Sequence, residues 1–143
     1  MKYKIEKLKK EDILKLNEIQ EKYFDMQTRE DFEFVLENDN YLFFTASLNN
    51  KIIAYAGVSI SYERSDLLCV CVEQEYRRQG VARQLLSKLF DSLKQRKVEE
   101  ILLEVNVNNQ KAINLYQTLG FDKIHERKNY YGNDTAVIMR KVL

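Results

Sequence analysis

Apolar residues along this chain switch repeatedly between two spacings, and this alternation limits the possible fold more than any other feature of the sequence. Between residues 81 and 93 they recur every three or four positions, which is the period of an amphipathic helix. Residues 41–48 and 51–61 are instead rich in β-branched and aromatic side chains, as is typical of strands. Applied to the whole chain, the pattern predicts the order β α α β β β α β α β β. We therefore expect an α/β fold with a mixed, mostly antiparallel sheet of six or seven strands and helices on both faces.

Two helices are expected before the central strands. The apolar stripe from residue 13 to residue 23 predicts the first of them. Thr28 is the expected N-cap of the second, because its hydroxyl could accept a hydrogen bond from an unpaired backbone amide. Phe32, Val35 and Leu36 are the expected buried face of this shorter helix.

Length and charge narrow the class of protein. A chain of 143 residues fits one domain, here residues 1–143. The 23 lysines and arginines nearly balance the 22 aspartates and glutamates, so no broad positive field favours nucleic acid or an anionic membrane. The apolar runs are shorter than the roughly 20 residues of a membrane span, and residues 1–10 lack the apolar stretch of a secretion signal. We expect a cytoplasmic protein with no membrane or nucleic-acid partner.

The two cysteines predict neither a disulfide nor a metal site. Cys69 and Cys71 lie two residues apart in a predicted strand, so their side chains leave the same face and do not point at each other. His125 is the only histidine and is remote in sequence, which leaves no set of metal ligands. We expect two buried, reduced thiols, with a thiol acyl-enzyme as the alternative.

A glycine-containing turn joins an apolar strand to the amphipathic helix that begins near residue 81. The first amides of a helix lack intrahelical acceptors and lie at its positive end, so a phosphate group can bind there. Gly80 and Ala82 leave room for an anion to approach, and positive charge comes from Arg77, Arg78 and Arg83. An ordinary turn with a solvated basic face is the alternative. The sequence has neither a Walker A loop nor the Rossmann glycine fingerprint.

This turn resembles the acetyl-coenzyme A signature of the GNAT acyltransferases, whose core is Arg or Gln, two residues, Gly, one residue, then Gly or Ala. Here the core runs from Arg77 to Ala82. The second half of the chain is also similar to the family, in the Leu-Glu-Val of residues 103–105 and the Asn-x-x-Ala-Ile-x-Leu-Tyr-x-x-Leu-Gly-Phe of residues 109–121. Within the family, the sequence is most similar to the RimI-like ribosomal-protein alanine N-acetyltransferases.

The resemblance implies that acetyl-CoA is the co-substrate and lies between two splayed strands, residues 67–72 and 101–107. Backbone groups of the first strand would bind the pantetheine arm, and amides at the start of the following helix would bind the pyrophosphate. The residues expected to bind acetyl-CoA are Val70, Cys71, Val72, Arg77, Arg78, Gln79, Gly80, Val81, Ala82, Arg83, Asn109 and Tyr116. No metal is expected.

Two residues are expected to carry proton transfers. Glu104 is a carboxylate inside an otherwise apolar strand, which makes it the candidate general base, although strand alternation also allows an outward-facing surface residue. Tyr116 lies about two helical turns after Asn109. The resemblance implies that Tyr116 protonates the coenzyme thiolate and that Asn109 contacts the coenzyme. The alternatives are a core aromatic for Tyr116 and an N-cap for Asn109.

The expected reaction is transfer of an acetyl group to a primary amine, with the N-terminal α-amine of a protein as the favoured acceptor. The resemblance implies that Tyr130 and Tyr131 line the acceptor groove, and packing of the hairpin around residues 132–133 is the alternative. Residues 23–29 lack the Pro-Trp-Ser-like element of many RimI-like enzymes, which leaves the acceptor open. A small amine such as a polyamine or amino sugar, or a non-catalytic CoA-binding module, are the other interpretations.

Overall fold

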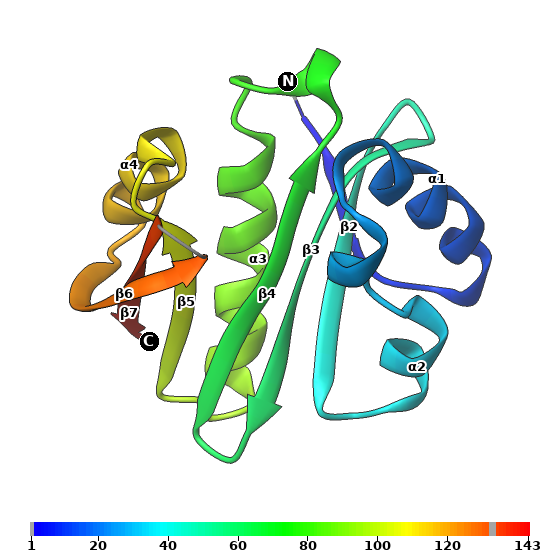
Figure 1. Ribbon diagram of the computed structural model, residues 1–143. Helices are drawn as coiled ribbons and strands as arrows, with labels where there is room; N and C mark the ends of the chain where they lie inside the picture. The colour runs from blue at the N-terminus through cyan, green and yellow to red at the C-terminus, as the bar shows by residue number, and fades with distance from the viewer. Residues whose placement is uncertain (1, 132–133) are drawn as a thin grey trace.

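The computed structural model describes residues 2–131 and 134–143, apart from the side chains of residues 129–131 (Figure 1). Its described strands form one seven-stranded sheet in the order β1-β2-β3-β4-β5-β7-β6. The strands are β1 (Lys4–Lys7), β2 (Tyr41–Leu48), β3 (Lys51–Ser61), β4 (Arg64–Val72), β5 (Glu100–Asn106), β6 (Asp122–Tyr131) and β7 (Asp134–Val142). The helices are α1 (Ile13–Tyr23), α2 (Phe32–Glu37), α3 (Val81–Gln95) and α4 (Gln110–Thr118). The predicted order of strands and helices and the mixed α/β class are confirmed.

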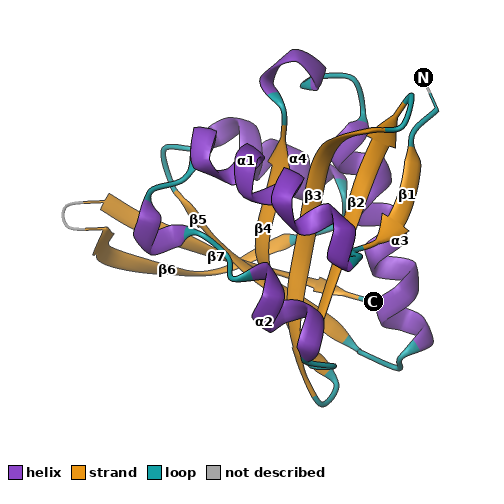
Figure 2. Ribbon diagram, turned by 90° about the vertical axis from the view of Figure 1, so that its right-hand side faces the viewer, coloured by secondary structure: helices purple, strands orange, loops and turns teal. Residues whose placement is uncertain are grey.

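Helices cover both faces of the sheet, and each face has its own core. α1 and α2 lie over one face, as Figure 2 shows from their side, and α3 and α4 pack on the other. The apolar stripe of α3 is buried along its whole length. Under α1 and α2, the rings of Phe32 and Tyr55 meet edge to face with their centroids 5.3 Å apart. No helix in the described ranges is long and apolar enough to cross a membrane.

β4 and β5 form the one parallel pair among the described strands, and they pair over only three residues. Their ladder ends where Asp66 lies opposite Leu102, after which the strands diverge (Figure 1). A bulge in β4 lies at the same place, because its register with β3 shifts by one residue between Gly57 and Val58. The sheet is therefore open between β4 and β5 beyond this point.

Two predictions around α2 were wrong. The N-cap is Asp31, whose Oδ1 accepts a hydrogen bond from the Phe34 amide at 3.1 Å. Thr28 lies in a short 3-10 turn and donates its hydroxyl to the Asp25 carbonyl instead. Leu36 is 40% exposed, because only Phe32 and Val35 of the six-residue α2 are buried in the core. The predicted buried face is thus reduced to Phe32 and Val35.

Gly57 provides a test of the packing beside the bulge. A Cβ atom at this position would lie 2.3 Å from ring atoms of Phe43. We expect Gly57→Ala to lower the free energy of unfolding by about 1–3 kcal/mol, the usual cost of overpacking a core. Urea denaturation measures this cost, with Ser61→Ala on the exposed end of β3 as the control. Adding Phe43→Leu should restore part of the loss, and an unchanged midpoint for Gly57→Ala would contradict this account.

Candidate functional site

A cavity of about 560 Å³ opens between the end of β4, the start of α3 and one side of α4. We call it the α3–α4 cavity. Ten of the residues predicted to bind acetyl-CoA line it, namely Val70, Val72, Arg77, Arg78, Gly80, Val81, Ala82, Arg83, Asn109 and Tyr116. The structure therefore brings together residues that are separated by more than 30 positions in the sequence. Tyr76, Lys111, Ala112 and Leu115 also line the cavity and were missed, because only their contact with the cavity distinguishes them from other loop and helix residues.

The turn before α3, which lines the cavity, has an unusual backbone with two residues of positive φ. Gly80 is the N-cap of α3 with φ of 81°, and Arg78 has φ of 64°. A Cβ at Gly80 would meet no atom within 4 Å, so the backbone conformation rather than lack of space requires glycine here. Alternating conformations of this kind create concave clusters of N–H groups that bind anions. The positive end of a 15-residue helix adds to this attraction.

Cys71 and Gln79 are the two predicted cofactor-binding residues whose side chains lie elsewhere. Cys71 is buried in the core under α1 and α2, on the face of the sheet opposite to the cavity. The Gln79 side chain donates to the Glu75 carbonyl at 3.1 Å, and the Gln79 carbonyl accepts from the Tyr3 hydroxyl at 3.2 Å. The prediction for both residues concerns backbone groups, so it stays a prediction.

Asn109 and Tyr116 each have the structural role that the sequence allowed and also line the cavity expected to bind the coenzyme. The Asn109 side chain caps α4 by accepting from the Ala112 amide at 3.3 Å, and it also lines the α3–α4 cavity. The Tyr116 ring packs against Phe121, with centroids 5.7 Å apart, while the residue lines the same cavity. Burial raises the pKa of Tyr116 to about 12, and the nearby Cys69 thiol contributes to the rise. The Tyr116 hydroxyl therefore keeps its proton at neutral pH and can donate it.

Glu104 lies on the other face of the sheet. Along β5, Leu103 and Val105 are buried in the core under α3, so alternation turns Glu104 toward the face of α1 and α2. There it lies in a groove of about 650 Å³ between β4, β5 and β6, which we call the Glu104 groove. Its Oε1 is 3.3 Å from an Nη1 of Arg127, and its side chain is 32% exposed. The outward-facing interpretation is therefore the observed one, but the outward direction leads into a groove.

Asp66 is a second carboxylate in the Glu104 groove that the sequence did not reveal. Burial raises the pKa of Asp66, while Arg64 works against the rise and the charge of Glu104 adds to it. The alternating charges of residues 63–66 look like an exposed turn, so only the pairing of β4 with β5 shows this proximity.

The α3–α4 cavity and the Glu104 groove lie on opposite faces of the sheet and both border the opening between β4 and β5. Before the bulge, Asp66 faces the groove, and after it Val70 and Val72 face the cavity. Two ligands that enter from opposite faces can therefore meet where the strands part.

The cysteines, the absence of a metal and the two tyrosines near the last turn are the remaining predictions from the sequence. Both cysteines are free, and burial raises the pKa of Cys71 to about 11 and also raises that of Cys69. Protonated thiols are poor nucleophiles, which disfavours the acyl-enzyme alternative. Within the described residues no cluster of His, Cys, Asp and Glu could hold a metal ion. The side chains of Tyr130 and Tyr131 and the turn at residues 132–133 lie outside the described part of the chain.

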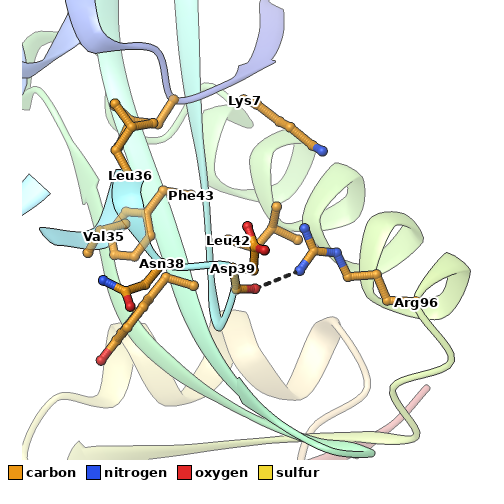
Figure 3. A pocket seen from close by; sticks show the side chains of 10 residues that line it. Lys7, Val35, Leu36, Asn38, Asp39, Leu42, Phe43 and Arg96 are labelled. Atoms are coloured by element: carbon orange, nitrogen blue, oxygen red, sulfur yellow. Dashed lines mark hydrogen bonds between the residues drawn. The ribbon is translucent and has the colours of Figure 1, made fainter. Parts of the chain in front are cut away.

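A smaller cavity of about 140 Å³ lies between α2, the start of β2 and the end of α3 (Figure 3). In Figure 3, Arg96 reaches across it and donates to the Asp39 carbonyl at 3.2 Å. None of the predicted site residues lines this cavity. It therefore adds nothing to the chemistry of the opening between β4 and β5.

Comparisons with known proteins agree with this geometry. Residues 9–121 match the Acetyltransferase (GNAT) family. The [Ribosomal protein bS18]-alanine N-acetyltransferase of Escherichia coli strain K12 is 37% identical over 107 residues, 72% of each chain. An N-alpha-acetyltransferase of Saccharolobus solfataricus is 34% identical over 113 residues, 68% of each chain. The crystal structure of the ribosomal-protein-S18-alanine N-acetyltransferase from Escherichia coli has a TM-score of 0.86 at 30% identity, covering 99% of this chain and 94% of that one.

The family match covers the strand, the glycine turn and α4, which are the elements that build the α3–α4 cavity. The sequence identity of the relatives is well above the level at which only a fold is shared. The chain therefore belongs to the GNAT family of acetyl-CoA-dependent N-acetyltransferases.

Proposed function

We propose that this chain acetylates the N-terminal α-amine of a protein, and that its acceptor is the N-terminal alanine of a ribosomal protein. The observation that carries the proposal is the opening between β4 and β5, which is bordered by the α3–α4 cavity on one face and the Glu104 groove on the other. The acceptor named for the Escherichia coli relative supports the choice of alanine. A cytoplasmic location would suit such an acceptor and stays a prediction.

The α3–α4 cavity fits acetyl-CoA in size and chemistry. Its volume of about 560 Å³ lies within the usual range for ligand pockets. The amides from Arg78 to Arg83 would bind the pyrophosphate, and Arg83 is already held across the cavity by donating to Thr118 at 2.8 Å. Val70 and Val72 form an apolar wall where the pantetheine arm would lie along the free edge of β4. When bound, acetyl-CoA supplies the acetyl group as a thioester.

An N-terminal amine suits a site whose candidate base is a carboxylate. Only a neutral amine can attack a thioester, and an α-amine has a reference pKa near 8 compared with about 10.4 for lysine. At pH 7.5 the neutral fraction of an α-amine is therefore larger by a factor of about 200. A carboxylate such as Glu104, acting directly or through water, would then provide enough basicity.

The proposed reaction uses Glu104 and Tyr116 on opposite sides of the opening. The amine nitrogen forms a bond to the acetyl carbon, and the bond from that carbon to sulfur breaks. Glu104 accepts the proton that the amine loses. Tyr116, whose hydroxyl is protonated at neutral pH, donates a proton to the departing sulfur. Tyr130 and Tyr131 would form a wall for the acceptor peptide on the side of β6 and β7.

The acceptor is tested by offering peptides and small amines to the protein with acetyl-CoA and measuring the release of free thiol. The rate of thiol release with a peptide that has a free N-terminal alanine should be about 100-fold or more above the rate with the same peptide when its N-terminus is blocked and its lysines are free. The reason is that the neutral fractions of the two kinds of amine differ by that order. Spermidine and an amino sugar represent the small amines. A preference for either of them over the alanine peptide would overturn the proposed acceptor.

Glu104→Gln keeps the size of the side chain and removes its ability to take a proton. We expect kcat to fall by about 100-fold or more while the Kd for acetyl-CoA stays the same. Glu126→Gln on β6, which breaks only an ion pair with Lys123, is the matched control. Full activity of Glu104→Gln with a verified acceptor would remove Glu104 from the role of base.

Tyr116→Phe tests the proton donor, because phenylalanine keeps the ring contact with Phe121 and lacks the hydroxyl. The expected result is a fall in kcat of about 100-fold with acetyl-CoA binding unchanged in calorimetry. Tyr62→Phe, at a tyrosine that is 92% exposed, provides the comparison. A Tyr116→Phe protein with the kcat of the unmodified chain would rule out this donor.

A further inference from the structure

The end of α1 is tied to the segment after β4 by four side chains, Lys22, Tyr23, Glu73 and Arg77, which we call the clasp. Glu73 is only 4% exposed. Its carboxylate accepts from the Lys22 Nζ at 2.9 and 3.2 Å and from the Tyr23 hydroxyl at 2.8 Å. Each of these contacts joins residues about fifty positions apart, so the clasp is a tertiary feature and not part of the glycine turn itself.

Tyr23 is the central member of the clasp. Its hydroxyl also accepts from the Gln74 amide at 3.0 Å, so it acts as donor and acceptor at once. Its ring lies under the Arg77 guanidinium, with Cζ 4.8 Å from the ring centroid. Arg77 is held a second time, because its Nε donates to the Val72 carbonyl at 2.9 Å.

The charge of Glu73 keeps the clasp closed. Burial alone would raise the pKa of Glu73, but the hydrogen bonds from Lys22 and Tyr23 outweigh this effect and lower the pKa below its usual value. The carboxylate is therefore ionised at neutral pH and holds both donors. The nearly buried carboxylate therefore links the last turn of α1 to the residue that follows β4.

The clasp supports a wall of the α3–α4 cavity from outside. Arg77 lines this cavity, whereas Tyr23 is not among the described residues that line it. Arginine loses much side-chain freedom when it binds an anion, and stacking on a fixed ring removes part of that freedom in advance. We infer that Tyr23 is a positioning residue for acetyl-CoA, because its ring orients Arg77 at the wall of the cavity and its hydroxyl fixes Gln74 at the start of the turn. This inference rests on the proposal that the cavity binds acetyl-CoA.

Calorimetric titration of the full chain with acetyl-CoA tests the inference. Tyr23→Ala, which removes ring and hydroxyl, should raise the Kd by about five- to tenfold, and Tyr23→Phe, which keeps the ring, should raise it by about twofold. Tyr62→Ala should bind like the unmodified chain. If Tyr23→Ala does not fold, Tyr23→Leu keeps part of the apolar volume without an aromatic face. Equal Kd values for folded Tyr23→Ala or Tyr23→Leu and the unmodified chain would overturn the inference.

A double-mutant cycle separates positioning from general stability. Because the ring of Tyr23 acts through Arg77 and its hydroxyl through Gln74, adding Tyr23→Ala to Arg77→Ala should weaken acetyl-CoA binding only by the roughly twofold effect of Tyr23→Phe, and not by the full effect of Tyr23→Ala. A merely structural role would lower the unfolding midpoint and leave the two effects on Kd independent, which would contradict the inference. The titration needs no acceptor, so its result does not depend on which amine is acetylated. Absence of binding by the unmodified chain would instead overturn the proposed function together with this inference.

Discussion

The short parallel contact between β4 and β5 is the constraint on which the rest of the structure depends. Parallel strands need a crossover, and α3 provides it, so the helix must begin where β4 ends. The strands then separate after three paired residues. Backbone groups of β4 after Asp66 are therefore left without a strand partner on the side of β5, close to where α3 begins. A place for an extended ligand beside a helix N-terminus is thus a result of sheet topology rather than of any one side chain.

The candidate proton donor and the candidate base lie on opposite faces of the sheet. Tyr116 is held by aromatic packing on the side of α3 and α4, where burial keeps its hydroxyl protonated. Glu104 lies on the other side, in a groove where its side chain is 32% exposed and forms an ion pair with Arg127. The candidate proton donor is therefore buried, whereas the candidate base is partly exposed. Strand alternation in β5 and the bulge in β4 are enough to create this difference.

The sequence predicted the features that depend on local order. The order of elements follows from spacing. Gly80 was predicted as a residue that leaves room for an anion, whereas the structure shows that its φ of 81° is the reason for glycine there. Near α2, two side chains could cap the helix within four positions, and local preference did not distinguish Thr28 from Asp31. The hydrogen bond from Tyr23 to Glu73 could not be predicted from the sequence, because it depends on how α1 packs against the end of β4. Asp66 was missed for the same reason, since its environment is set by a strand that comes much later in the chain.

Access from opposite faces also governs how the proposed products depart. Neither product would have to pass through the channel of the other, because the α3–α4 cavity and the Glu104 groove open on different sides of the sheet. The spent coenzyme could dissociate while a long polypeptide is still attached, and the polypeptide could diffuse away first without obstruction. Such an arrangement suits an acceptor much larger than the enzyme, whose bulk would block a site with a single entrance.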